Sequence, residues 1–271
     1  MQLFFYQDDV ISAHRTLDEA PDPRAFSMHA HERLELYCFL RGSGHFNVEG
    51  RRYKLREGDV LLMREAETHM LMISPDAPYE RIAVHFDPEL LRGLDPTLQL
   101  LRPFYDRPLG TRNRYRMGAA EDGFWRECLQ KLTAEPSPDR TTLLAYLIPL
   151  LAEITRLAET AEDDPKTVGE AAPIVAYVNR HLFEPLSLAQ LSGVFFMSQS
   201  QLNRVFRKAT GSTAARYIEI KRLLAARSRI RQGEKPGEAS RKCGFGDYSS
   251  FFRAYRAYFG ASPSDDRSAA K

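Results

Sequence analysis

The sequence has few cysteines and no long apolar run. Three of its 271 residues are cysteines, Cys38, Cys128 and Cys243. An odd number of widely separated thiols argues against a disulfide framework or a thiolate zinc site, and predicts free thiols in a reducing compartment such as the cytoplasm. No segment approaches the roughly 18 to 20 apolar residues that span a bilayer. Residues 1–10 also lack the basic-then-apolar order of a signal peptide, so no membrane partner is expected.

The charge of the chain is unevenly distributed. The whole sequence is 43% hydrophobic and 27% charged, with a net charge of +2, which is ordinary for a soluble globular protein. Residues 172–271 contain 17 Lys and Arg against 7 Asp and Glu, a net charge of +10, whereas the preceding residues contain 21 and 29, a net charge of −8. A length of 271 residues accommodates two domains. The asymmetry predicts that only the basic second part meets a polyanion.

Short strands are predicted throughout the first hundred residues. An apolar run at 34–40 is broken by Gly42-Ser43-Gly44, and residues 45–48 and 52–55 flank the hairpin turn Glu49-Gly50. Further short apolar runs occur at 60–63, 70–73 and 82–86, separated by Gly-Asp, Pro-Asp and Ala-Pro turn signals. Many closely spaced strands are typical of a β-sandwich or β-barrel.

Helical periodicity replaces this pattern after Pro88. Residues 121–132 and 140–157 carry apolar side chains at helical spacing. The second segment has a wide stripe that either packs on its own barrel or forms a dimerisation surface, and the pattern does not distinguish the two. The polar segment 161–171 is the best candidate for a linker. The stripe consists of Leu143, Leu144, Leu147, Leu150, Leu151, Ile154 and Leu157.

The last hundred residues contain a repeat. Residues 203–212 are echoed by residues 252–261, so that an arginine, an aromatic residue, a second arginine and a glycine recur at an offset of 49 residues. Ser187 and Ser198, each with a glutamine three residues later, predict two helices begun by capping boxes. In the second copy, Pro236 suits a first helical turn and Asp247 suits an N-cap. A short helix, a turn and a basic helix are the layout of a helix-turn-helix unit.

The second helix of each copy predicts a polar outward face above an apolar inward one. Leu202, Val205 and Phe206 would face the core in the first copy, and Phe251 and Tyr255 in the second. The alternative is a helical bundle with a solvated basic face, which explains the charge but not the repeat. Asn and Gln pair with adenine, and Arg pairs with guanine. The predicted DNA-binding side chains are Gln199, Ser200, Asn203, Arg204 and Arg207, followed by Tyr248, Ser249, Phe252, Arg253 and Arg256.

Residues 174–267 resemble the DNA-binding domain of the AraC/XylS family of transcriptional regulators. The resemblance is carried by "SLAQLSG", "MSQSQLNRVFRKATGSTAARYIEIKRLLAA" and "CGFGDYSSFFRAYRAYFGASP". It implies two helix-turn-helix units that enter successive major grooves about 34 Å apart. The sequence departs from the family at Ala239, Ser240 and Asp266, which we expect to weaken packing of the second unit. By position, the base-facing residues are Ser200, Asn203 and Arg204, then Tyr248, Ser249 and Arg253.

Residues 25–87 resemble cupins. His29-Ala-His31, Glu35 and Gly42 follow the spacing of the first cupin motif, and residues 58–69, ending in His69, follow the second. The resemblance implies a set of three histidines and one carboxylate, His29, His31, Glu35 and His69, able to hold Fe, Mn, Ni or Zn. The alternative is structural, because a buried histidine can bond to a carboxylate without a metal.

An effector pocket is expected inside the barrel. The alternative for each candidate side chain is ordinary core packing. By analogy with the family, a polar pocket rich in histidine would suit a sugar, a small carboxylate or another metabolite. The candidate lining is His29, His31, Glu35, Tyr37, Phe39, His69, His85 and Phe86.

The sequence thus predicts a multidomain protein of α and β structure. A cupin-like β-barrel sensor (1–100), a helical linker or dimerisation region (101–160) and an all-α DNA-binding domain with two helix-turn-helix units (172–271) follow in order. The sequence predicts a cytoplasmic transcriptional regulator that responds to an effector. We expect it to be an activator and not an enzyme. Expected partners are double-stranded promoter DNA, a small molecule, a second copy of the chain and RNA polymerase. The alternatives are a cupin metalloenzyme with a helical appendage and a ligand-independent DNA-binding repressor.

Overall fold

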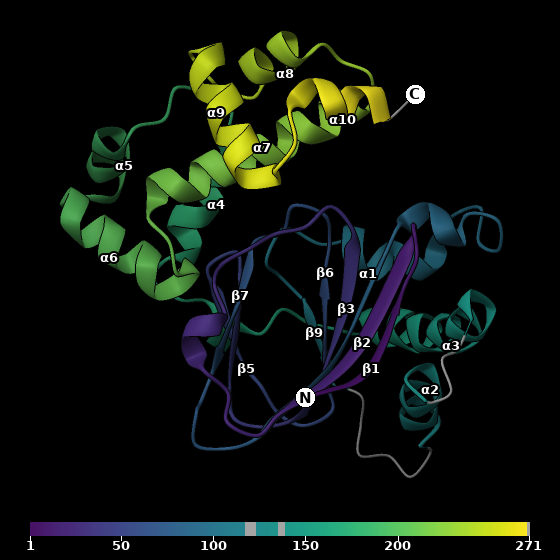
Figure 1. The fold of residues 1–271 in the computed structure, drawn as a ribbon. Coiled ribbons are helices and arrows are strands. Elements are labelled where there is room, and N and C mark those ends of the chain that lie inside the picture. The colour runs from purple at the N-terminus through teal and green to yellow at the C-terminus, as the bar shows by residue number, and fades with distance from the viewer. Residues whose placement is uncertain (117–122, 135–138, 270–271) are drawn as a thin grey trace. The chain divides into compact units, whose positions relative to one another are not determined.

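The computed structural model describes residues 1–116, 123–134 and 139–269 (Figure 1). The chain divides into two compact units, Met1–Val168 and Gly169–Lys271. Unit 1 is a β-rich domain followed by helices, and every regular element described in unit 2 is helical. The predicted fold class, a cupin-like barrel followed by helices and an all-α domain, is therefore confirmed.

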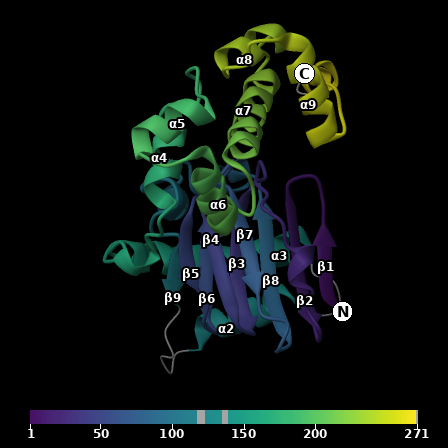
Figure 2. The ribbon, with the colours of Figure 1, turned by 90° about the vertical axis from the view of Figure 1, so that its left-hand side faces the viewer.

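Unit 1 contains two antiparallel sheets. The larger has the strand order β1-β2-β8-β3-β6-β9 and the smaller the order β5-β4-β7; Figure 2 shows the strands of the larger sheet side by side. The strands are β1 (Gln2–Gln7), β2 (Ile11–Asp18), β3 (Leu34–Arg41), β4 (Gly44–Val48), β5 (Arg51–Lys54), β6 (Asp59–Met63), β7 (His69–Ile73), β8 (Tyr79–Phe86) and β9 (Arg114–Arg116).

Strand β3 shows how the alternation of side chains builds two cores. Leu34, Leu36 and Cys38 face a core shared with the helices, whereas Tyr37 and Phe39 face the core between the sheets. The predicted break at residues 42–44 matches the tight approach of β4 to β7. A Cβ on Gly44 would lie 2.5 Å from the carbonyl oxygen of Met72, so no larger residue fits without a shift.

Helices α2 (Phe124–Leu132) and α3 (Arg140–Ala158) pack on the larger sheet, together with the short α1 (Arg102–Tyr105). The apolar stripe of α3 was expected either to pack on the barrel of the same chain or to form a dimerisation surface. Five of its residues are buried in the core that α3 shares with the larger sheet, as the first interpretation predicts. Helix α3 is long and apolar enough to cross a membrane by length and composition, but core helices of soluble proteins pass the same test. The five buried stripe residues are Leu143, Leu147, Leu150, Leu151 and Ile154.

Several predicted boundaries need correction. The sequence pattern missed β1, β2 and β9, which pair at the edges of the larger sheet. His29 does not lie in a strand but forms an isolated β-bridge with His69. Residues 121 and 122, predicted as the start of a helix, lie outside the described residues. Four 3₁₀ turns complete unit 1, at Pro23–Ala25, Pro88–Leu91, Gln99–Leu101 and Pro165–Thr167.

Unit 2 is built from seven helices among its described residues. Both predicted capping boxes are present, with the hydroxyls of Ser187 and Ser198 accepting from the backbone of Gln190 and Gln201. Asp247 also caps its helix, as predicted. The helices are α4 (Ala172–Arg180), α5 (Leu188–Phe195), α6 (Gln199–Thr210), α7 (Ala214–Arg231), α8 (Pro236–Lys242), α9 (Tyr248–Phe259) and α10 (Pro263–Ala269).

Helix α7 connects the two helix-turn-helix units. Phe206 of α6 packs edge-on against Tyr217 near the start of α7, with ring centroids 5.7 Å apart. Phe251 and Tyr255 of α9 pack against Leu223 and the rest of the second half of α7. The repeat in the sequence is therefore a pair of helices that share one connecting helix.

The departures from the family pattern do not leave the second unit loosely packed, so that expectation is wrong. Ala239 and Ser240 are buried in α8. The buried Asp266 carboxylate accepts hydrogen bonds from Arg227 at 2.9 and 3.0 Å, and from Tyr255 at 2.6 Å. A charge network replaces the aromatic contact expected at this position.

All three cysteines are free and buried. Cys38 lies in β3, Cys128 in α2, and Cys243 follows α8. Burial raises the pKa of Cys38 to about 12. The prediction of free thiols is confirmed.

Candidate functional sites

The interior of unit 1 holds a cavity of about 340 Å³. Its walls come from β2, β3, β4, β7, β8 and the segment around residues 25–29. Its polar lining combines one carboxylate, one guanidinium and several imidazoles. The lining residues are His14, Ala25, Phe26, Ser27, His29, Glu35, Tyr37, Phe46, His69, Leu71, Arg81, Ala83 and His85.

Glu35 is the centre of the polar cluster. Its side chain is 7% exposed, and its carboxylate lies 2.8 Å from Nε2 of His31, 3.2 Å from Nε2 of His69 and 3.7 Å from Nε2 of His85. His31, Glu35 and His69 offer ligand atoms within 4.8 Å of one another. The structure therefore brings together three of the four residues in the predicted metal set and leaves His29 outside it.

Contacts within the cluster shift the pKa values of its members. Burial raises the pKa of Glu35, but the neighbouring His85 and the bonds from His31 and His69 outweigh burial and hold this pKa well below its usual value. Burial lowers the pKa of His85 to about 4, so this ring is neutral near pH 7. Burial lowers the pKa of the His69 imidazole, but its hydrogen bond to Glu35 and the charge of that carboxylate outweigh burial and raise it. The site thus contains an ionised carboxylate whose histidine neighbours have pKa values shifted in opposite directions.

A second polar group lies further along the same two strands, β3 and β8. The hydroxyls of Tyr37 and Tyr79 are 2.7 Å apart, and Nη1 of Arg81 donates to the Tyr79 hydroxyl at 3.1 Å. Arg81 also lies over the ring of Phe26, 5.6 Å from its centroid. The cavity lining therefore also contains a positive charge, and Tyr37 contributes a hydroxyl two residues from Glu35 on β3.

Sequence reasoning found part of the cavity lining. Phe39 packs on Tyr79 in the core between the sheets, and Phe86 belongs to the core that faces the helices, so neither lines the cavity. His31 bonds to Glu35 but is not itself among the lining residues. His14 and Arg81 line the cavity and were missed. His14 stacks on His85 with ring centroids 6.0 Å apart. His14 lies in β2, a strand that the sequence pattern did not reveal.

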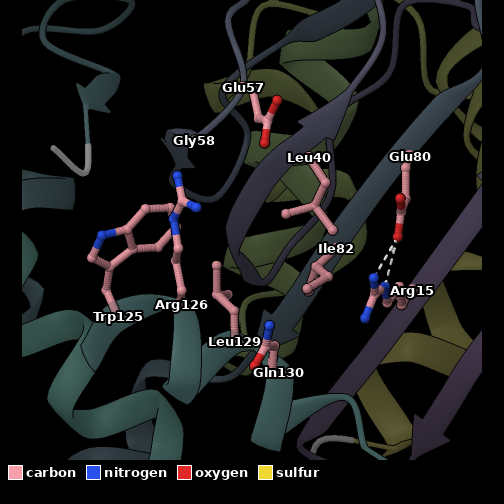
Figure 3. A pocket seen from close by; sticks show the side chains of 10 residues that line it. All are labelled: Arg15, Leu40, Glu57, Gly58, Glu80, Ile82, Trp125, Arg126, Leu129 and Gln130. Carbon is pink, nitrogen blue, oxygen red and sulfur yellow. Dashed lines mark hydrogen bonds and ion pairs between the residues drawn. The ribbon is translucent and has the colours of Figure 1, made fainter. Parts of the chain in front are cut away.

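A smaller cavity of about 220 Å³ lies between the larger sheet and α2 (Figure 3). Trp125, Arg126 and Leu129 of α2 line one side. On the other side Arg15 and Glu80 form an ion pair at 2.6 Å, drawn as dashed lines. Two of the charges in its walls, those of Arg15 and Glu80, are thus already paired within the protein.

In unit 2, α6 and α9 present the predicted polar faces. Both helices have 12 residues, an N-cap side chain and a C-terminal glycine with positive φ, Gly211 at 73° and Gly260 at 72°. Arginine and serine side chains project from each helix into solvent, while the apolar side chains point inward. The exposed predicted residues are Gln199, Ser200, Arg204, Arg207, Tyr248, Ser249, Arg253 and Arg256.

Two matches to protein-family models agree with this geometry. An AraC-like ligand binding domain matches residues 15–163, more than half of the chain, and a helix-turn-helix domain matches residues 191–269. The chain belongs to the AraC family of transcriptional regulators.

The chain is also similar to individual transcriptional regulators. The chain is 25% identical to the HTH-type transcriptional activator RhaS of Salmonella arizonae over 90% of this chain and 88% of that protein. It is 39% identical to the probable transcriptional regulator LumQ of Photobacterium leiognathi, over 32% of this chain and 36% of LumQ. ToxT from Vibrio cholerae is a structural neighbour with 12% identity, a TM-score of 0.40, and coverage of 95% of this chain and 97% of ToxT.

The predicted DNA-binding residues differ in their exposure and in their partners. Asn203 is half-buried, and its Oδ1 accepts from the backbone N–H of Ala214 at 3.3 Å, so its carbonyl helps to start α7. Phe252 is also half-buried, with its ring 6.4 Å from that of Tyr248. Arg204 and Arg207 are exposed, and their side chains make no hydrogen bond or ion pair to another described residue. These two guanidinium groups are therefore available to a partner.

Proposed function

We propose that this protein is a sequence-specific, DNA-binding transcriptional activator that responds to a small molecule bound in the barrel of unit 1. The observation that carries the proposal is the pair α6 and α9, which have matching caps, equal length and exposed basic faces within one unit. Recognition helices of this kind read base edges through their N-terminal residues. Activation, rather than repression, is supported by the similarity to RhaS along most of both chains.

We assign base contacts to the first two turns of the two helices. Ser200, Arg204 and the amide nitrogen of Asn203 would serve α6, while Tyr248, Ser249 and Arg253 would serve α9. Gln199 at the start of α6 is an additional candidate. Arg207 and Arg256 lie in the last turns and suit phosphate contacts, which position the protein without reading sequence.

The effector we propose is a small polar metabolite, such as a sugar or a small carboxylate. The cavity of about 340 Å³ offers a hydrogen-bonding lining that includes both Glu35 and Arg81. His29, His31, Tyr37, His69 and His85 would contribute further polar contacts. Binding can change DNA affinity only if the effector binds two states of the protein differently.

The remaining assignments are also proposals. We place the protein in the cytoplasm, as a homodimer with no catalytic activity of its own, which meets RNA polymerase at the promoter. Five residues of the α3 stripe are buried in unit 1. A dimer would therefore form through other residues.

A direct test measures binding of the full chain to DNA from the region upstream of its own gene. Fluorescence anisotropy at several salt concentrations should show specific binding whose affinity falls steeply with salt, because phosphate contacts release counterions. The double variant Arg204→Ala and Arg253→Ala should lose the specific binding. Equal affinity for the upstream region and for unrelated DNA would contradict the proposal, and a genome-wide binding map would then identify any other target.

A further inference from the structure

The cavity between the larger sheet and α2 combines an apolar floor with charged walls (Figure 3). Ile82 of β8 and Leu129 of α2 are 1% and 3% exposed, and Leu40 near the end of β3 is partly buried against the same core. Figure 3 shows these three aliphatic side chains between Trp125 and the ion pair of the opposite wall. The volume of about 220 Å³ is below the roughly 300–1,000 Å³ of sites for drug-sized ligands, so the cavity suits a smaller molecule, about the size of one amino acid.

Four charged side chains are among the residues that line this cavity, and two of them form a pair. Arg15 and Glu80 neutralise each other at 2.6 Å. Arg126 and Glu57 are exposed, and their side chains make no hydrogen bond or ion pair to another described residue. The guanidinium carbon of Arg126 lies 5.2 Å from the ring centroid of Trp125. One positive and one negative group therefore remain at the cavity without a partner of opposite charge in the part of the chain that the structure describes.

These two groups match the two ends of a zwitterion. A carboxylate suits the guanidinium of Arg126, whose planar N–H donors can bind both carboxylate oxygens. An ammonium group suits the carboxylate of Glu57, which only accepts hydrogen bonds. An uncharged ligand would leave both charges unpaired, and a ligand with one charge would leave one of them unpaired. The apolar floor suits a side chain without polar atoms, because a polar group there would lose its hydrogen bonds to water.

We propose that this cavity is a second small-molecule site, separate from the barrel, which binds an α-amino acid with an apolar side chain. Arg126 would bind the carboxylate and Glu57 the ammonium group, while Leu40, Ile82 and Leu129 would contact the side chain. None of the described residues that line this cavity also lines the barrel cavity. Because the lining comes from both the larger sheet and α2, a bound amino acid would join the two and stabilise unit 1. The site goes beyond the proposed function and does not depend on it.

Trp125 is the single tryptophan of the chain, so its fluorescence reports on this cavity rather than on the barrel. The test titrates the full chain with L-leucine and with L-phenylalanine, and follows tryptophan emission and the heat of binding. We expect saturable binding of at least one of them, together with a change in emission. Its analogue without the ammonium group (isocaproate or hydrocinnamate) and its analogue without the carboxylate (isoamylamine or phenethylamine) should each bind at least about tenfold more weakly.

Arg126→Gln and Glu57→Gln should each weaken binding of the amino acid by about tenfold or more, because each removes one charged partner. Lys131→Gln and Glu127→Gln are the matched controls. They remove the same charges from exposed positions of α2 that do not line the cavity. Both controls should bind the amino acid like the unchanged chain.

Three results would overturn the proposal. The first is no saturable binding of either amino acid by the unchanged chain, and the second is equal binding by the unchanged chain and Arg126→Gln. The third is an analogue with one charge that binds as tightly as the amino acid, since it would show that the cavity does not pair both charges. Arg126 and Glu57 are exposed, so their replacement should leave the fold intact, and circular dichroism of each variant checks this.

Discussion

Nη1 of Arg222 donates to the carbonyl oxygen of Gly244 at 2.8 Å, joining the connecting helix α7 to the turn before α9. The same guanidinium donates to Leu182 at 2.8 Å and to Glu184 at 2.7 Å, both in the segment after α4. Gly244 has a φ of 83°, and a Cβ there would lie 2.9 Å from Cζ of Arg222. One side chain thus fixes two turns to α7 at a point where only glycine fits closely.

We expect Arg222→Met to destabilise unit 2. It leaves three carbonyl groups without their charged donor, and each lost bond costs about 1 kcal/mol. The free energy of unfolding should fall by about 2–4 kcal/mol in urea denaturation of the full chain. Arg216→Met is a control on the same helix, because Arg216 pairs with Glu219 on the surface and such pairs contribute about 1 kcal/mol or less. Equal losses in the two variants would contradict this role of Arg222.

Arg204→Ala should weaken binding to the target site by about 1–3 kcal/mol and relax preference at one base position. The reason is that the exposed guanidinium lies in α6 and is not paired with another described residue. Binding to a library of site variants measures both effects. Arg24→Ala, in unit 1, is the control and should leave binding unchanged. Unaltered affinity and preference in Arg204→Ala would show that α6 is not placed in the groove as proposed.

Asp266→Asn should destabilise the second helix-turn-helix unit by about 3 kcal/mol, because removing one partner of a buried ion pair leaves the other charge uncompensated. The carboxylate is 6% exposed and binds Arg227, Arg231 and Tyr255. Hydrogen exchange should show the loss in α9 and α10 more than in α5 and α6. A uniform loss would mean that the two halves of unit 2 unfold together.

Glu67→Gln should destabilise unit 1 in a pH-dependent manner. Burial raises the pKa of Glu67, but the charge and hydrogen bonds of Arg107, with backbone bonds from Gly110 and Arg64, lower it to about 2. The stabilisation is therefore complete above the unfolded pKa of about 4.3 and is lost as pH falls towards 2.

Near pH 7 the Glu67→Gln variant should be about 3–5 kcal/mol less stable, since Arg107 is 1% exposed and would lose its partner. Urea denaturation from pH 7 to pH 2 measures the difference, which should shrink below about pH 4.3. Glu89→Gln is a control, because its pair with Arg92 is exposed on the surface. A difference between the unchanged chain and Glu67→Gln that stays constant across this range would refute the assignment.

Local features of unit 2 were predictable from sequence, and distant partnerships were not. Ser187 and Ser198 cap helices with glutamines three residues away, so a short window contains the whole motif. Asp266 meets Arg227 and Arg231, which are 39 and 35 residues distant. No short pattern reveals such a network, which is why Asp266 was expected to weaken a core that it helps to hold.

The barrel cavity shows the same limit. His31 and Glu35 lie four residues apart, and their pairing follows from local spacing. His14 and Arg81 reach the cavity because β2 and β8 pair with His14 opposite Ala83. This register depends on contacts about 70 residues apart in sequence, and β2 carries no clear alternation of apolar and polar side chains. Phe39 was misplaced because alternation identifies an inward face but not where on that face a cavity opens.

The burial of the three cysteines makes them internal reporters of local opening. Cys38, Cys128 and Cys243 lie in the barrel, in the helical layer and in the second helix-turn-helix unit. A thiol reagent reacts with a buried, protonated thiol only after the structure around it opens. The order in which the three are modified therefore gives the relative stability of these regions without any substitution in the chain.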